Sequence, residues 1–271
     1  MDFKNAPLFA QGNTAEIFSL DETRVLKLYK KGMGKQACER EYRSTKAMSE
    51  LLGCVPAVYE MVEQDGRYGI VFEKIFGTDM LQAVTEHPSQ LGRFASALAD
   101  YHLAIQKAVD ISDLPLLKDC LKRNILRTDD LTEQEKHTVL NCLQALPDGN
   151  KLCHMDLHPG NVILRHGNPV ILDWMTACAG DRCADAARTC LLILYPEMPR
   201  GGWLQKRAFS LLKRRFLHGY LKQYKQKSGV CQEQIDAWKI PILAARLSEG
   251  ITPGEKQRIL SDLRKQLRRR P

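Results

Sequence analysis

One stretch of the sequence most constrains how this chain can fold. Residues 154–161 read His-Met-Asp-Leu-His-Pro-Gly-Asn, and two β-rich runs follow them. The runs, 162–165 and 170–172, consist mainly of Val, Ile and Leu and are separated by His-Gly-Asn-Pro, a turn composition. They predict an antiparallel hairpin. In such a hairpin the residue that enters the first strand lies beside the residue that leaves the second. We therefore expect Asn161 and Asp173 to meet at its open end.

Asp156, Asn161 and Asp173 match the polar groups of a phosphoryl-transfer site. Mg²⁺ takes few protein ligands when a nucleotide completes its shell, so one amide and one carboxylate suffice. Asp156 lies five residues before Asn161 and can orient an acceptor hydroxyl and take its proton. Singly, such residues are more often ordinary turn or hydrogen-bonding residues. Jointly, H-x-D-L-x-x-x-N and a later strand-terminal Asp agree with the catalytic loop and metal-binding aspartate of kinases.

A zinc site is the alternative interpretation of the same segment. His154, Asp156 and His158 all carry side chains that can ligate zinc. The kinase interpretation accounts in addition for Pro159, Gly160 and the hairpin. A metal-dependent hydrolase is therefore the weaker alternative.

A lysine and a glutamate form a second candidate group near the N-terminus. Runs at 15–20 and 24–29 predict two strands joined by a tight turn. In the helix expected over 36–52, Glu41 interrupts an apolar stripe, and a carboxylate there needs a partner. Lys27 is the natural candidate, and this pair would hold its ammonium against nucleotide phosphates. The alternative is a surface Glu41 that contributes little.

The remaining sequence indicates more strands and then a helical part. Runs at 57–62 and 68–72 enclose Gln-Asp-Gly-Arg and predict a second hairpin, and we place a lobe boundary near residue 76. Asp181 and Asp185 either cap a helix or support the loop at 154–161. Predicted helices cover 89–108, 116–126, 132–146, 184–194, 203–224 and 232–247, with Pro241 kinking the last, and a further helix begins at Thr252-Pro253.

Composition narrows the class of protein. The 271 residues with 44% hydrophobic content can bury a substantial core. No basic region leads into an apolar stretch at the N-terminus and no run approaches membrane-spanning length, so we expect a cytoplasmic protein without a membrane partner. Nine irregularly spaced cysteines without a C-x-x-C pair predict reduced thiols.

Positive charge gathers in the last quarter of the chain. Residues 200–271 contain 18 Lys and Arg against 5 Asp and Glu, whereas residues 1–199 contain 22 against 27. The basic run at 264–270 could attract nucleic acid. No interleaved aromatic residues or nucleic-acid module accompany it, so we interpret it as a solvated helix face and expect no nucleic-acid partner.

The chain resembles the aminoglycoside phosphotransferase and choline kinase-like family of small-molecule kinases over nearly its whole length. Residues 154–161 are similar to the family's H-G-D-L-H-P-G-N signature, and 171–174 to its metal-binding segment. Residues 12–17 resemble the nucleotide loop and 25–27 the lysine strand. Residues 180–189 also resemble the family.

The resemblance implies a role for each matching position. Asp156 would be the catalytic aspartate, and Asn161 and Asp173 the Mg²⁺ ligands. The residues implied at the nucleotide are Asn13, Thr14, Lys27, its paired Glu41, and the backbone of Glu73 and Ile75 at the adenine. The chain departs from the signature at Met155, where a small residue is common. Few glycines in the N-terminal loop and the absence of an A-P-E segment argue against a protein kinase.

We therefore predict an α+β, bilobal protein-kinase-like fold. A small antiparallel-sheet N-lobe, 1–76, would bind nucleotide, and a mainly helical C-lobe, 77–271, would carry the catalytic loop and the acceptor. The expected reaction moves the γ-phosphate of ATP, or of GTP, with Mg²⁺ to a hydroxyl of a small molecule, such as an aminoglycoside, an amino alcohol like choline, or a sugar. A nucleotide-binding pseudokinase that acts as an interaction module is the alternative.

Overall fold

The structure is a computed structural model that describes residues 6–12, 14–107, 111, 113–197 and 202–269. Its two units comprise Met1–Ala83 with Pro159–Thr176, and Val84–His158 with Ala177–Pro271. The expected lobes divide the chain differently, because the segment around the 162–171 hairpin packs with the N-terminal sheet. The functional division into a nucleotide lobe and an acceptor lobe stays a prediction.

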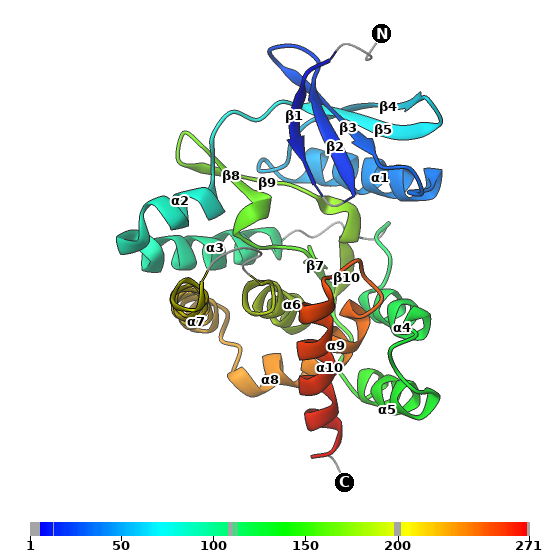
Figure 1. Ribbon diagram of the computed structural model, residues 1–271, viewed down its shortest axis with the longest axis vertical. Coiled ribbons are helices and arrows are strands. Elements are labelled where there is room, and N and C mark those ends of the chain that lie inside the picture. Colours follow the sequence, from blue (N-terminus) through cyan, green and yellow to red (C-terminus); the bar gives the residue numbers. More distant parts are fainter. Residues whose placement is uncertain (1–5, 13, 108–110, 112, 198–201, 270–271) are drawn as a thin grey trace. The chain divides into compact units, whose positions relative to one another are not determined.

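The first unit contains a five-stranded antiparallel sheet, in the order β1-β2-β3-β5-β4, and a three-stranded sheet, in the order β6-β8-β9. Helix α1 lies alongside the larger sheet (Figure 1). The elements are β1 (Leu8–Gln11), β2 (Ala15–Ser19), β3 (Arg24–Tyr29), α1 (Lys35–Leu51), β4 (Val58–Gln64), β5 (Arg67–Glu73), β6 (Thr78–Asp79), β8 (Val162–Arg165), β9 (Asn168–Ile171) and the short 3₁₀ helices η2 (Pro159–Asn161) and η3 (Trp174–Thr176).

The alternation of side chains along β3 decides which of them face α1. Leu26 and Leu28 pack in a cluster with Val71 of β5, whereas Tyr29 packs in another cluster with Cys38 of α1. Successive side chains of a strand point to opposite faces of the sheet. Lys27, between the two leucines, therefore shares the α1 face with Tyr29, although a lysine in an alternating strand normally faces water.

Both predicted hairpins of this unit are present, each with a two-residue turn. Strands β4 and β5 join through Asp65 and Gly66, whose φ angles are 50° and 71°. Strands β8 and β9 join through His166 and Gly167, with φ angles of 50° and 84°. Such pairs of left-handed residues make turns whose twist matches the flanking strands. Because the second turn is this tight, β9 begins at Asn168, two residues earlier than expected.

The second unit is mainly helical and contains one small two-stranded sheet. Strands β7 and β10 pair antiparallel, and α3 packs against α7. The elements are η1 (Pro88–Gln90), α3 (Leu91–Ile105), α4 (Leu117–Arg127), α5 (Glu133–Gln144), β7 (Lys151–Cys153), β10 (Cys178–Gly180), α6 (Arg182–Leu194), α7 (Trp203–Ser228), α8 (Gln232–Ala237), α9 (Lys239–Arg246) and α10 (Pro253–Leu267), while α2 (Met80–Glu86) spans the division between the units.

The predicted helices are present, with one correction. The pattern over 232–247 forms two short helices that meet at Trp238, and not one helix kinked at Pro241. Pro241 lies in the first turn of α9, where a missing backbone N–H costs no helical hydrogen bond. None of the helices in the described part of the chain combines the length and the apolarity needed to cross a membrane.

The turn at Asp65-Gly66 gives a test of this backbone geometry. Gly66→Ala should lower the free energy of unfolding by about 1 kcal/mol, because only the left-handed φ opposes a side chain there and no atom lies within 4 Å of the added Cβ. Gly53→Ala is the matched control, since its Cβ also meets nothing within 4 Å and its φ is not left-handed. Urea unfolding measures both variants, and equal effects would contradict the assigned turn.

Candidate functional site

Lys27 forms the centre of a partly buried charge cluster in the first unit. Its Nζ lies 2.6 Å from Glu41 Oε1 and 3.3 Å from Asp173 Oδ1. The Glu41 side chain is only 2% exposed, and its other oxygen accepts a short hydrogen bond from the Tyr29 hydroxyl. The predicted Lys27–Glu41 ion pair is therefore present, and the alternative of a surface glutamate is wrong.

The carboxylates keep the buried ammonium charged. Burial alone would lower the pKa of Lys27, but the charges of Glu41 and Asp173 outweigh it and hold that pKa above its ordinary value. Burial and the adjacent Glu41 raise the pKa of Tyr29, so its hydroxyl stays a neutral donor. The Lys27 ammonium is therefore a cation held in a fixed position. The Asp173 side chain, which is 35% exposed, keeps contact with solvent.

Asn161 and Asp173 flank the open end of the β8–β9 hairpin, as predicted. Val162 pairs with Ile171, and the Leu172 N–H donates to the Asn161 carbonyl over 2.9 Å. As a result, the Asn161 amide and the Asp173 carboxylate border one hairpin end. Asp173 itself has a left-handed φ of 64°, a conformation that Asp tolerates better than most residues.

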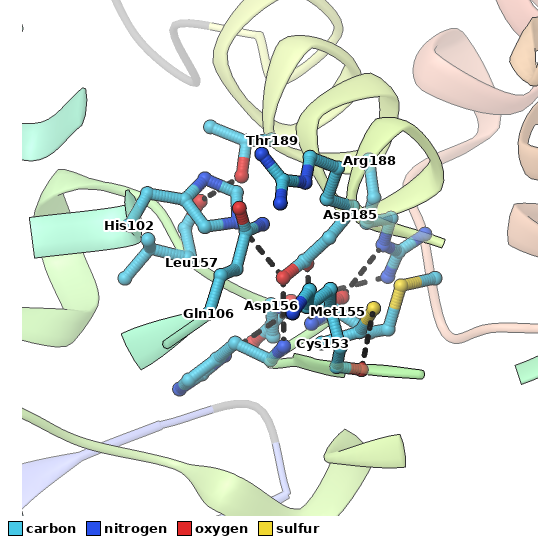
Figure 2. Close-up of polar contacts among 12 residues, drawn as sticks. His102, Gln106, Cys153, Met155, Asp156, Leu157, Asp185, Arg188 and Thr189 are labelled. Carbon is cyan, nitrogen blue, oxygen red and sulfur yellow. Dashed lines mark hydrogen bonds and ion pairs between the residues drawn. The ribbon is translucent and has the colours of Figure 1, made fainter. Parts of the chain in front are cut away.

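The loop that carries Asp156 is fastened to one face of α6 in the second unit. Asp185, Arg188 and Thr189 are spaced three and four residues apart, so they share a helix face. Asp185 accepts hydrogen bonds from the backbone N–H groups of His154 (2.9 Å) and Met155 (2.8 Å). Arg188 Nε donates to the Met155 carbonyl over 2.9 Å, and Thr189 Oγ1 donates to the Leu157 carbonyl over 2.9 Å. Figure 2 shows these side chains reaching from the helix to the loop.

Asp185 is itself held by a buried network. His102 Nε2 lies 2.8 Å from Asp185 Oδ2, and His102 Nδ1 lies 2.7 Å from the Tyr220 hydroxyl. Burial alone would raise the pKa of Asp185, but His102 and the Met155 amide outweigh it and hold that pKa below its ordinary value. Of the two predicted roles, Asp185 supports the loop, while Asp181 caps α6 by accepting from the Cys183 N–H over 2.6 Å.

Met155 adopts a left-handed backbone conformation, with a φ of 62°. The family signature has a small residue here, and glycine adopts this conformation without a steric penalty. Met155 as a whole is only 8% exposed. Burial of this apolar side chain therefore opposes the backbone strain that the same residue introduces.

Three other residues predicted to bind nucleotide, Thr14, Glu73 and Ile75, lie at or just beyond the ends of strands of the five-stranded sheet. Thr14 is exposed, and its carbonyl accepts from the Lys30 N–H, while Asn13 lies outside the described residues. Glu73 ends β5 and forms an ion pair of 2.7 Å with Arg165 of β8. Ile75 follows β5 and is half-buried. The contacts of these residues with a nucleotide stay predictions.

The zinc alternative finds no geometric support. Among the described residues, which include His154, Asp156 and His158, no three His, Cys, Asp or Glu side chains are grouped so that they could hold a metal ion. The Nδ1 atom of His154 instead accepts from the Asp156 N–H over 3.2 Å. This histidine thus contributes to the conformation of the loop.

Three residues that hold the loop were not predicted as such. Arg188 and Thr189 lie in a segment that resembles the family's sequence, but the resemblance assigned them no role. His102 lies outside every segment for which a resemblance was given. The spacing of Arg188 and Thr189 after Asp185 is the one sequence signal that could have indicated them. His102 lies in an ordinary helix, α3, and has no local signal.

Comparisons with known proteins agree with this geometry. A model of the phosphotransferase enzyme family matches residues 6–227. No curated protein matches the sequence. The chain is similar to the crystal structure of an aminoglycoside-3'-phosphotransferase of type VIII, with 18% identity, a TM-score of 0.60, and coverage of 88% of this chain and 91% of that chain.

Two further solved structures show the same fold. The gentamicin complex of APH(2")-IIa is 18% identical, with a TM-score of 0.60 and coverage of 99% of this chain and 92% of that chain. Choline kinase from Cryptosporidium parvum Iowa II is 13% identical, with a TM-score of 0.57 and coverage of 97% of this chain and 88% of that chain. The predicted α+β, protein-kinase-like fold class is thus confirmed.

The buried carboxylate of Asp185 predicts a specific pH dependence. Asp185→Asn should lower the free energy of unfolding near neutral pH by about 3 kcal/mol, because it removes a buried charge whose partners stay in place. Because folding lowers the pKa of Asp185, the stability it contributes is present above the ordinary value of 3.8 and is lost as the pH falls through the folded value. The difference between wild type and variant should therefore be constant near neutral pH and shrink below about pH 4.

Urea unfolding between about pH 3 and pH 7 measures this difference. Asp181→Asn is the control on the same helix, because asparagine caps a helix about as well as aspartate. A difference between wild type and Asp185→Asn that does not change with pH would contradict the assigned charge.

The left-handed backbone at Met155 predicts that a glycine variant is more stable than an alanine variant, the reverse of the order expected in a helix. Met155→Gly and Met155→Ala both lose the buried side chain, but only glycine relieves the left-handed strain, so the glycine variant should be the more stable by about 1 kcal/mol. At Met48, which is buried in α1, alanine should be the more stable by about 1 kcal/mol. Thermal unfolding of the four variants tests the order, and the same order at both sites would contradict the assigned φ.

Proposed function

The chain belongs to the phosphotransferase enzyme family, and we propose that it transfers the γ-phosphate of Mg²⁺-bound ATP to a hydroxyl group of a small molecule. The observation that carries this proposal is the cluster in which the Lys27 ammonium lies 2.6 Å from Glu41 and 3.3 Å from Asp173. A buried cation beside a metal-binding carboxylate is what a kinase uses to hold nucleotide phosphates.

Lys27 is the proposed phosphate-binding residue, and Glu41 keeps its ammonium in place. Thr14 and Asn13 would contribute at the phosphates, and the backbone of Glu73 and Ile75 at the base. Solved structures with similar folds include complexes with ATP, ADP or GDP, which supports a purine nucleotide as the donor. The experiment below therefore includes GTP as well as ATP as phosphate donor.

Asn161 and Asp173 are the proposed Mg²⁺ ligands. An amide oxygen and a carboxylate are hard donors of the kind that Mg²⁺ prefers. The two residues border the same end of a hairpin, where Val162 and Ile171 form the last strand pair. When bound, Mg²⁺ would neutralise charge on the phosphates. The residues present therefore fit the ion.

Asp156 is the proposed catalytic residue. It would accept the proton of the acceptor hydroxyl while the hydroxyl oxygen bonds to the γ-phosphorus and the bond to the leaving ADP oxygen breaks. Such a role needs a fixed carboxylate. The hydrogen bonds from α6 to the backbone on both sides of Asp156 support this requirement.

The acceptor belongs to the class of small hydroxylated molecules. Similar folds include aminoglycoside phosphotransferases and a choline/ethanolamine kinase family protein from Mesorhizobium loti. We therefore propose aminoglycosides, amino alcohols and sugars as the first acceptors to test.

The test is a screen of ATP and GTP consumption over these acceptors with wild type and two variants. Asp173→Ala should abolish Mg²⁺-dependent turnover, because it removes a metal ligand and a partner of Lys27. Asp156→Asn should bind nucleotide as wild type does and lose about 10²-fold or more in kcat, because asparagine cannot accept the proton.

Asp21→Asn is the control, since Asp21 is an exposed turn carboxylate of the first unit. It should keep wild-type turnover. Turnover that persists in Asp173→Ala would contradict the proposal, and nucleotide binding without turnover of any acceptor would favour the pseudokinase alternative.

A further inference from the structure

A buried arginine lies beside the carboxylate of Asp156. The Arg188 side chain is 5% exposed, and its Nη2 lies 3.9 Å from Asp156 Oδ1 and 2.8 Å from Glu249 Oε2. Its Nε donates to the carbonyl of Met155, the residue before Asp156 (Figure 2). One guanidinium therefore contacts the backbone and the side chain of the proposed catalytic loop.

The charge of Arg188 is maintained by Glu249. Burial alone would lower the pKa of Arg188, but Glu249 and then Asp156 outweigh it and raise that pKa. The planar guanidinium has donors in a fixed fork. With Nε bonded to the Met155 carbonyl and Nη2 to Glu249, the orientation of this fork is set.

Glu249 lies between α9 and α10 and is in turn held by the last residue of α9. It forms an ion pair with Arg246, and Arg246 Nε lies 3.1 Å from Glu255 Oε1 in the first turn of α10. Charges thus alternate in sign from Asp156 through Arg188, Glu249 and Arg246 to Glu255. The position of Arg188 therefore depends on groups well outside the loop.

We propose that Arg188, held by Glu249, is a positioning residue that fixes the carboxylate of Asp156 for phosphoryl transfer. The inference rests on the proposed function, because it assigns Arg188 a role through Asp156. Arg188 would hold the loop backbone through the Met155 carbonyl and restrain the carboxylate by its charge. Lysine could not replace it, since a single ammonium does not reproduce the fork.

The competing explanation is that Arg188 only stabilises the fold by neutralising Glu249. A double variant separates the two roles. Arg188→Met alone leaves Glu249 with only one of its two arginine partners, whereas Arg188→Met combined with Glu249→Gln removes both charges of the Arg188–Glu249 pair. If the role is only structural, the double variant should recover both stability and activity.

The readout is phosphate release from Mg²⁺-ATP with water as the acceptor, so no other acceptor is needed. Water oxygen bonds to the γ-phosphorus, the bond to the leaving ADP oxygen breaks, and ADP, phosphate and a proton are released. Rates are divided by the folded fraction at the assay temperature. We expect the double variant to melt near the wild-type temperature, to keep the wild-type KM for ATP, and to lose about tenfold or more in kcat.

Arg188→Lys provides a second test that preserves the buried positive charge. It should fold, keep the KM for ATP and still lose several-fold in kcat. Arg264→Lys is the control for the chemical change, because Arg264 pairs with Glu135 of α5 over 2.7 Å, and it should keep the wild-type kcat. Wild-type kcat in Arg188→Lys, or recovery of kcat together with stability in the double variant, would overturn the inference.

Measurements on the wild-type protein distinguish a failure of the Arg188 inference from a failure of the proposed function. Absence of phosphate release by wild type, both with water and with every screened acceptor, would overturn the proposed function and the inference with it. Release by wild type with unchanged kcat in the Arg188 variants would overturn the inference alone.

Discussion

A charged side chain can be buried only beside groups that compensate its charge, and this constraint organises the candidate functional residues within each unit. In the first unit it places Glu41 of α1 against Lys27 of β3. In the second it gives Asp185 two backbone amides and His102 as partners. Side chains of α6 therefore hold the loop around Asp156, in addition to the hydrogen bond that the loop makes within itself.

Part of the site could be predicted because its signals are local. Glu41 interrupts an apolar stripe at helical spacing, which indicates a buried carboxylate that needs a cation. Lys27 was the nearest candidate in a neighbouring strand, and the ion pair is present. The runs of Val, Ile and Leu around a turn likewise predicted the hairpin between Asn161 and Asp173. Each of these inferences needs only the pattern of one element and its neighbour.

The remaining features depend on contacts that no local pattern encodes. Residues 183–193 of α6 are all buried, so hydrophobic periodicity does not reveal which face meets the loop. Only the spacing of Arg188 after Asp185 indicates that the two residues share a helix face. The short strands β6, β7 and β10 have two or three residues each, too few to show a period. The division of 232–247 into α8 and α9 likewise depends on the chain geometry at Trp238.

The discontinuity of the first unit has a consequence for biosynthesis. The strand β8 pairs with β6, and Ile171 donates a backbone hydrogen bond to the Cys54 carbonyl, so the N-terminal sheet region is completed by residues that the ribosome adds much later. Domains that are continuous in sequence fold in order from the N-terminus during synthesis. Here the five-stranded sheet can form early, but β6 and the Cys54 carbonyl lack these partners until residues 162–171 have been made. During that period chaperones have access to the unpaired backbone groups.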